Sequence, residues 1–357
     1  MAEILSNPWL AGLVMLVGGI ALVGGGEALV RGASKIALGL RISPLVVGLT
    51  VVALCTSAPE MAVSFSSALR GGPGVADVAF GNVVGSNICN ILLILGVCAL
   101  IRPLSSSENI VRRDFPVAVL LSLATFLVPL CCRNDAGNSA LPQWYGFILL
   151  AAFVGYEVVV VRAARREENA KYAAQAARTA APTPEMTAAL DAGNANLKTA
   201  VGAVGWVVAL LQIIVGLALL VVGARGFVDG ASALARSFGV SELVIGLTLV
   251  ALGTSLPELT VSAVATYRNQ VDVALGNVIG SNVCNLVLVL GGTLALLPRG
   301  MAIQPQSLYV DLPVMLGAAI VAAWFCLTGR KLDRWEGALL LAAQFGYAFY
   351  LVRFAAA

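Results

Sequence analysis

The sequence predicts an all-α polytopic membrane protein, with ten transmembrane helices arranged as two inverted-topology five-helix repeats and with helices broken at a shared ion site. Three observations lead to this prediction. Hydrophobic residues make up 59% of the 357 residues and charged residues only 11%, whereas soluble domains have about 25% charged residues. The apolar residues fall into ten segments, and two sequence blocks of the first half recur in the second.

Each apolar segment is expected to be a helix, because a span needs about 20 apolar residues to cross roughly 30 Å of hydrocarbon and an open strand cannot satisfy its backbone in lipid. The first segment is predicted to be a permanent span, since Glu3 stands where a cleavable signal would carry positive charge. The ten segments are 8–30, 43–69, 74–101, 115–132, 142–162, 201–224, 240–266, 271–297, 309–328 and 335–354.

One long polar stretch, 163–200, separates the fifth segment from the sixth, and its Ala-rich sequence with a PTP break predicts a partly helical linker. The chain is thus divided into a first repeat at 1–162 and a second at 201–357. With the linker in the cytoplasm, 16 of the 22 Lys and Arg residues lie on the cytoplasmic side, as the positive-inside rule requires. Both termini are then expected outside. Five spans per half invert the second half, as in many secondary transporters.

The repeat is clear at the level of single residues. Block 48–70 matches 246–268 at 13 of 23 positions, and 77–96 matches 272–291 at 14 of 20. The motifs within these blocks lie at 48–60, 77–90, 246–258 and 272–285. Upstream, RGAS at 31–34 aligns with DGAS at 229–232.

A charge swap accompanies the upstream match. Glu27 and Arg31 in the first half become Arg225 and Asp229 in the second, each pair spaced to meet on one helix face. A neutralised pair near the membrane boundary is the favoured interpretation, and a part in transport chemistry is the alternative.

Glu60 follows Pro59 within an apolar run, and an acid in such a place is a functional-site hypothesis by default. Proline lacks an N–H and breaks the helix, which frees backbone carbonyls near Thr56. Thr56 and Glu60 are four residues apart and are expected on one face. The second half repeats the arrangement with Thr254, Ser255, Pro257 and Glu258.

The downstream motifs add neutral oxygens, because Ser86 and Asn90 share a helix face, as do Ser281 and Asn285. The motif glycines are expected to allow close helix approach. Four further amides are equally interpretable as polar contacts between helices or as ligands: Asn82, Asn87, Asn277 and Asn282.

Two carboxylates and several neutral oxygens suit a hard cation such as Ca²⁺, which takes six to eight oxygen ligands. The chain has no His, and its cysteines form no zinc pattern, which argues against Zn²⁺ or Cu⁺. The cysteines are expected to be small core residues; they are Cys55, Cys89, Cys98, Cys131, Cys132, Cys284 and Cys326.

The paired TS-x-PE and GN-x-x-GSN-x-x-N repeats resemble the alpha repeats of the cation/calcium exchanger superfamily, nearest the prokaryotic type of its sodium/calcium exchanger branch. The resemblance covers nearly the whole chain. It implies that Glu60 and Glu258 bind Ca²⁺ and Na⁺, and that Thr56 and Thr254 contribute oxygens, largely backbone carbonyls. It also implies sodium sites lined by Ser57, Ser86, Ser255, Ser281 and the carbonyls of Ala53 and Ala251. Asn90 and Asn285 match the pair that ends the second motif.

Some relatives carry Asp where this chain has Asn285, which leaves sodium stoichiometry and potassium dependence open. The resemblance implies a multi-pass protein of a prokaryotic plasma (inner) membrane, whose partners are the lipid bilayer and the transported ions. No cofactor, nucleic acid or obligatory protein partner is expected.

The predicted function is antiport of Ca²⁺ against Na⁺ by alternating access, because one Ca²⁺ or two Na⁺ neutralise two carboxylates. Proton-coupled exchange of Ca²⁺ or another divalent cation is the main alternative, and a passive cation channel is less favoured. Enzyme function is not expected, since HExxH sites and Ser-His hydrolase sites need His.

Overall fold

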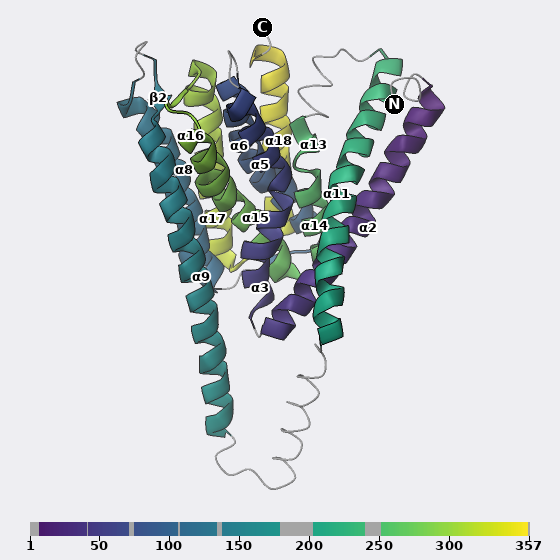
Figure 1. Cartoon of the computed structure of the whole chain (residues 1–357), viewed down its shortest axis with the longest axis vertical. Helices are drawn as coiled ribbons and strands as arrows, with labels where there is room; N and C mark the ends of the chain where they lie inside the picture. Colours follow the sequence, from purple (N-terminus) through teal and green to yellow (C-terminus); the bar gives the residue numbers. More distant parts are fainter. Residues whose placement is uncertain are drawn as a thin grey trace.

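The computed structural model describes residues 7–40, 42–70, 75–105, 108–133, 138–178, 203–239 and 251–355. These residues are overwhelmingly helical (Figure 1). Seven of the described helices are long and apolar enough to cross a membrane, or eight when the bent pair around Ser57 is counted as one span. The fold is therefore that of an all-helical polytopic membrane protein. Part of the predicted seventh segment, 240–250, lies outside the described residues, as do 179–200 of the predicted linker.

The first half comprises α2 (Pro8–Leu40), α3 (Pro44–Val47), η1 (Gly48–Val52), α4 (Ala53–Thr56), α5 (Ala58–Arg70), α6 (Val75–Cys89), η2 (Asn90–Leu95), α7 (Gly96–Ile101), β1 (Leu104–Ser105), η3 (Ile110–Asp114), α8 (Phe115–Cys131), β2 (Ala140–Leu141) and α9 (Gln143–Arg178). The second half comprises α11 (Ala203–Ser237), α13 (Ala251–Gly253), α14 (Leu256–Tyr267), α15 (Val271–Cys284), η5 (Asn285–Leu290), α16 (Gly291–Ala295), β3 (Met301–Ala302), η6 (Ser307–Asp311), α17 (Leu312–Gly329), β4 (Lys331–Leu332), α18 (Arg334–Tyr350) and η7 (Leu351–Ala355).

Three helices run well past their predicted apolar segments. Helix α2 continues ten residues beyond the predicted end, to Leu40, and α11 continues to Ser237. Helix α9 continues to Arg178, so the described start of the predicted linker is helical. Hydropathy marks where the apolar run ends, whereas a helix continues to a stop signal. Soon after α2 ends, the next helix begins with Ser43 as its N-cap and Pro44 in its first turn.

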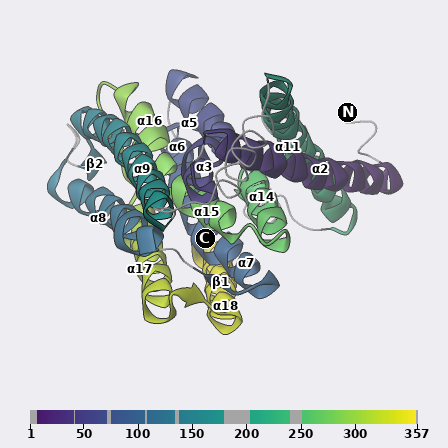
Figure 2. The same cartoon turned by 90° about the horizontal axis from the view of Figure 1, so that it is seen from below.

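Helices α2 and α11 form an antiparallel pair at one side of the bundle in both views (Figures 1 and 2). Glycines seven residues apart line their contact. A Cβ on Gly25 would lie 2.7 Å from the Gly216 carbonyl oxygen, and one on Gly18 would lie 2.8 Å from that of Gly223. The backbones therefore touch directly, which only small residues permit in a membrane.

Helix α15 is the most enclosed element, with every residue from 273 to 284 buried. A Cβ on Gly276 would lie 2.7 Å from the Leu45 carbonyl oxygen, and one on Gly280 would lie 2.6 Å from that of Leu49. The expected close approach is thus confirmed for the second motif. For Gly81 and Gly85 of the first motif, no atom of the described part lies within 4 Å of an added Cβ. The residues equivalent to 45 and 49 are 243 and 247, which are not described.

Two short antiparallel ladders join loops of opposite halves and were not predicted. Strand β1 pairs with β4, and β2 pairs with β3. Two-residue strands carry too little sequence pattern for prediction. They place the loops of one half directly against those of the other.

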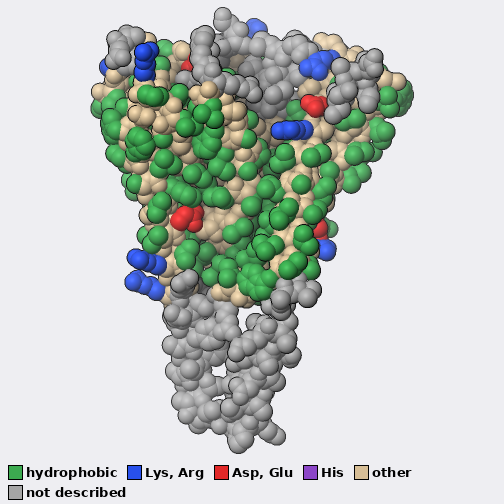
Figure 3. Space-filling model, viewed as in Figure 1, with side chains coloured by type: hydrophobic (Ala, Val, Ile, Leu, Met, Phe, Trp, Pro, Cys, Tyr) green, Lys and Arg blue, Asp and Glu red, His purple; other side chains and the backbone are tan. Residues whose placement is uncertain are grey.

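The face shown in Figure 3 is predominantly hydrophobic where it is described, and its charged side chains stand mainly toward the upper and lower margins. Large apolar side chains such as Trp9 and Val222 are exposed, a pattern that a lipid environment explains and water does not. The prediction of core cysteines holds for Cys89, Cys98, Cys284 and Cys326, which are buried, but is wrong for Cys131, which is exposed near the end of its span.

Candidate functional site

The site is built around two helix breaks. Helix α4 ends at Thr56 and α5 begins at Ala58 with Pro59 in its first turn, giving a bend of 45°. Helix α13 likewise ends at Gly253, and α14 begins at Leu256 with Pro257 in its first turn. Proline is tolerated there because the first-turn N–H groups lack helical partners in any case. The predicted breaks are confirmed, and each places a glutamate in the first turn of the new helix.

Both glutamates are fully buried. The Ser86 hydroxyl donates to Glu60 Oε1 at 3.3 Å, while Glu60 Oε2 and both carboxylate oxygens of Glu258 have no hydrogen-bond partner. Neither carboxylate takes part in an ion pair with any described Lys or Arg. Burying an unpaired carboxylate is costly, so these three oxygens have the environment expected of ligands whose partner is an external cation.

Glu60 and Glu258 come from opposite halves and are close enough to interact electrostatically, and the hydroxyls of Thr56 and Ser57 lie beside Glu258. Thr254 in turn lies next to Glu60. The break at Ser57 interrupts the helical spacing between Thr56 and Glu60. Each threonine lies beside the glutamate of the opposite half.

Further hydroxyl contacts cross between the halves. Thr56 Oγ1 donates to Asn277 Oδ1 at 3.0 Å, is 3.3 Å from the Ala53 carbonyl oxygen, and lies 3.4 Å from Ser281 Oγ. Ser255 Oγ lies 3.4 Å from Ser86 Oγ. These contacts bring together the predicted site residues Thr56, Ser86, Ser255 and Ser281 of the two repeats. The Ser57 hydroxyl is buried without a partner. The side chain of Ala251 is not among those described.

One pair of asparagines holds the broken helices in position. Asn82 Nδ2 donates to the Glu60 carbonyl oxygen at 3.2 Å and to Ser64 Oγ at 3.0 Å. Asn277 Nδ2 repeats this with the Glu258 carbonyl oxygen at 3.4 Å and Ser262 Oγ at 2.9 Å. Of the two open interpretations, these contacts favour the structural one. Sequence reasoning missed Ser64 and Ser262, although their identical spacing from the glutamates could have revealed them.

A second group of asparagines joins the halves. Asn87 Nδ2 donates to the Asn282 carbonyl oxygen at 3.3 Å, and Asn282 Nδ2 donates to that of Asn87 at 3.3 Å. Asn90 Nδ2 donates to Asn282 Oδ1 at 2.9 Å, and Asn285 Nδ2 donates to Asn87 Oδ1 at 3.2 Å.

The side-chain amides in this second group make two kinds of contact. Asn87 and Asn282 use both ends of the side-chain amide for contacts between the halves. Asn90 and Asn285 use only the nitrogen, and their Oδ1 atoms are buried without a partner. Their amide orientation is therefore fixed with the oxygen left available, as a cation ligand requires.

Two of the six π-helical stretches (η) in the described residues begin at Asn90 and at Asn285, and each runs for six residues. Such turns are rare and occur often at functional sites. No feature of the sequence predicted them.

Within the described residues, no group of three or more His, Cys, Asp or Glu side chains could hold a metal. A cation here would rely on the two carboxylates and neutral oxygens.

Comparison with known proteins identifies the family. The sequence model described as "Sodium/calcium exchanger protein" matches residues 10–162 and 208–355. The chain belongs to this family of exchangers. The gap in the match, 163–207, nearly coincides with the predicted linker.

Similar exchangers extend over almost the whole chain. It is 35% identical to "Putative antiporter CaxA" of Alkalimonas amylolytica over 96% of this chain and 98% of that protein. It is 32% identical to "Sodium/calcium exchanger MaX1" of Methanosarcina acetivorans, again over 96% and 98%. A solved structure of the sodium-calcium exchanger NCX_Mj, soaked without Na⁺ and Ca²⁺, matches with a TM-score of 0.74 and 30% identity, covering 97% of this chain and 100% of that one.

The exchanger is thus a multi-pass membrane protein of a cation-transporting family, and the family predicted from its two motifs is confirmed. Membership also agrees with the predicted class of integral membrane antiporters for calcium and sodium. A relative of Escherichia coli, 35% identical over 89% of each chain, is described as "Inner membrane protein YrbG".

Proposed function

We propose that this exchanger is a secondary active antiporter that moves Ca²⁺ against Na⁺ by alternating access at the site between its two helix breaks. One observation carries the proposal: six buried acceptor oxygens around the site have no protein partner, namely Glu60 Oε2, both carboxylate oxygens of Glu258, Asn90 Oδ1, Asn285 Oδ1 and Ser57 Oγ. Carboxylate oxygens together with neutral oxygens are the kind of ligand that Ca²⁺ prefers.

We assign to the residues the roles that the family resemblance implies. Glu60 and Glu258 supply the charge, and the Asn90 and Asn285 oxygens complete the central site. Ser57, Ser86, Ser255 and Ser281, with Thr56, Thr254 and the carbonyls of Ala53 and Ala251, provide the surrounding oxygens for Na⁺. Ca²⁺ and Na⁺ are the transported ions, and no cofactor is needed.

Charge balance explains the coupling. Two carboxylates carry a formal charge of −2, which one Ca²⁺ or two Na⁺ neutralise. An empty site keeps two buried charges uncompensated, which is unfavourable in a medium of low dielectric constant. The loaded protein therefore switches between its two open states more readily than the empty one. A third bound Na⁺ would leave a net charge and make transport electrogenic.

We also propose ten spans in two inverted repeats, 1–162 and 201–357, with both termini outside and the linker of 163–200 in the cytoplasm. Paired contacts support the two repeats, because the bonds that Asn82, Asn87 and Asn90 donate to oxygen have equivalents from Asn277, Asn282 and Asn285.

The decisive experiment measures ⁴⁵Ca²⁺ uptake into proteoliposomes. An outward Na⁺ gradient without a pH gradient is expected to drive uptake, and addition of K⁺ tests whether it is co-transported. Uptake driven by a pH gradient alone would replace Na⁺ by H⁺ as the coupling ion. Uptake that neither saturates nor shows counterflow would indicate a channel and overturn the proposal.

A further inference from the structure

Two surfaces that the repeat makes equivalent differ in packing: one is hollow and the other is packed. A cavity of about 610 Å³ lies between α5, α11 and the α13–α14 break. It reaches Pro59, Thr254 and Pro257 beside the site glutamates, and Arg225 and Asp229 stand in its wall. Its other lining residues are Ala58, Ala62, Val63, Ser66, Leu217, Val221, Ala224, Val228 and Gly253.

Each lining residue has an equivalent in the other repeat, 198 positions away in the sequence, on α2, on α14 or at the other helix break. At these equivalent positions the surfaces of α2 and α14 are in contact. A Cβ on Gly26, the equivalent of Ala224, would lie 3.1 Å from the side chain of Thr260, the equivalent of Ala62. Val30 and Val261, equivalents of Val228 and Val63, are fully buried in one core cluster. The route to the site is thus open along α11 and closed along α2.

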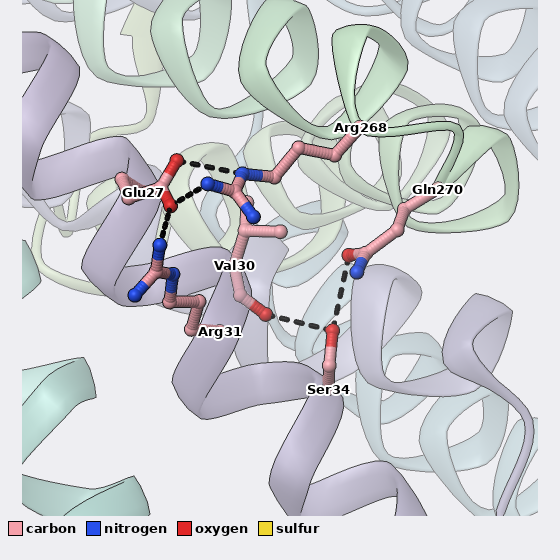
Figure 4. A network of polar contacts seen from close by, with 6 residues as sticks. All are labelled: Glu27, Val30, Arg31, Ser34, Arg268 and Gln270. Carbon is pink, nitrogen blue, oxygen red and sulfur yellow. Dashed lines mark hydrogen bonds and ion pairs between the residues drawn. The ribbon is translucent and has the colours of Figure 1, made fainter.

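An ion pair spans the closed surface. The Glu27 carboxylate on α2 accepts a hydrogen bond from Arg268 Nε at 2.6 Å and also contacts Arg268 Nη2 (Figure 4). Arg268 caps the end of α14, in the other half. Arg31 contacts the same carboxylate at 2.6 Å from one turn along α2 itself. Ser34 Oγ, also on α2, donates to Gln270 Oε1 at 3.0 Å.

The open side lacks these links. No described residue forms an ion pair with Arg225 or Asp229, the equivalents of Glu27 and Arg31. The hydroxyl of Ser232, the equivalent of Ser34, is buried without a partner. Charged contacts between the halves therefore accompany the packed surface, and among the described side chains, which do not include that of Arg70, none is found at the hollow surface.

We propose that the Glu27–Arg268 ion pair is a lock on alternating access: it holds α2 against α14, and it must break before the route to the site opens on that face. The inference rests on the proposed function in requiring that this face opens during transport. A two-point contact between a carboxylate and a guanidinium is directional, so separation of α2 from α14 breaks both bonds together. Arg31 moves with Glu27 and cannot serve as the lock.

A native cysteine reports on this opening. Cys55 is the equivalent of Gly253, which lines the cavity on the open side. It is half-buried and packs against the core cluster that contains Leu29 and Val30 of α2. When the face opens, Cys55 should reach water.

The experiment measures the labelling rate of Cys55 by a charged methanethiosulfonate reagent. It uses full-length protein in nanodiscs without Ca²⁺ or Na⁺, with Cys131 and Cys132 replaced by Ser. R268Q and E27Q are each expected to accelerate labelling about threefold to fivefold, as removal of a partly exposed ion pair allows. The double variant should be labelled at the same rate as the single variants, because each single substitution already removes the same interaction. R31Q, which removes the other arginine from the same carboxylate, should stay within about twofold of the parent protein.

Unchanged labelling in R268Q, additive effects in the double variant, or equal acceleration in R31Q would each overturn the lock. Size-exclusion profiles and melting temperatures identify any variant that has lost its fold, and the three variants give independent opportunities for a folded one. Labelling needs no transported ion, so failure of the lock leaves the proposed antiport standing. Absent ⁴⁵Ca²⁺ exchange with the expected labelling would instead overturn the antiport.

Discussion

Glutamate 258 offers the sharpest test of the ion site, because both of its carboxylate oxygens are buried without a partner. Replacement by Gln keeps the shape and removes the charge. The formal charge of the site falls from −2 to −1. A bound divalent cation then loses at least about 4 kcal/mol of binding free energy, because one unit-charge pair at about 4 Å interacts with about that energy when the effective dielectric constant is about 20. That corresponds to roughly a thousandfold loss of Ca²⁺ affinity.

The same substitution should have the opposite effect on the empty protein. Glu258 has no hydrogen-bond donor, whereas Glu60 accepts one from Ser86, so removal of the Glu258 charge relieves an uncompensated buried group. A gain of about 1–2 kcal/mol would raise the melting temperature by a few degrees, at about 2–4 °C per kcal/mol for a large domain.

The assay is a melting curve of detergent-solubilised protein with and without Ca²⁺, paired with ⁴⁵Ca²⁺ uptake. Wild-type protein should be stabilised by Ca²⁺, and E258Q should start higher, show no shift and not transport. E157Q is the matched control, because Glu157 lies in a span outside the site, and it should keep the Ca²⁺ shift. A full Ca²⁺ shift and normal uptake in E258Q would refute the reasoning.

Three further predictions follow from other contacts. N87A should lower the melting temperature by an amount equivalent to about 2–3 kcal/mol, because it removes bonds to Asn282 and Asn285 and leaves their polar atoms unpaired; N90A should mainly reduce Ca²⁺ uptake, and equal stability loss in both would contradict the division of roles. Uptake of Ca²⁺ should fall between pH 8 and 5, since two adjacent carboxylates in a dry site compete for protons when no cation is bound; a constant rate would count against it. G25A should destabilise the α2–α11 pair, because its Cβ would lie 2.7 Å from a backbone oxygen, whereas G24A, with nothing described within 4 Å, should be neutral or slightly stabilising in thermal melts.

The sequence by itself determined the membrane class, the two repeats, the helix breaks and the residue types of the site. It could do so because lipid restricts the backbone to helices and because an acid placed after a proline in an apolar run is too costly to persist without a function. Periodicity also placed Ser86 with Asn90 and Ser281 with Asn285 on common faces.

Only the tertiary structure decided which oxygens are available. Asn87 and Asn90 belong to the same motif, yet one amide is fully used between the halves and the other keeps a free oxygen. Thr56 lies beside the glutamate of the other repeat. Such contacts join residues about 200 positions apart, and local spacing carries no information about them. The unequal packing along α2 and α11 is likewise invisible in the two similar sequence blocks, because neither block records how the halves pack against each other.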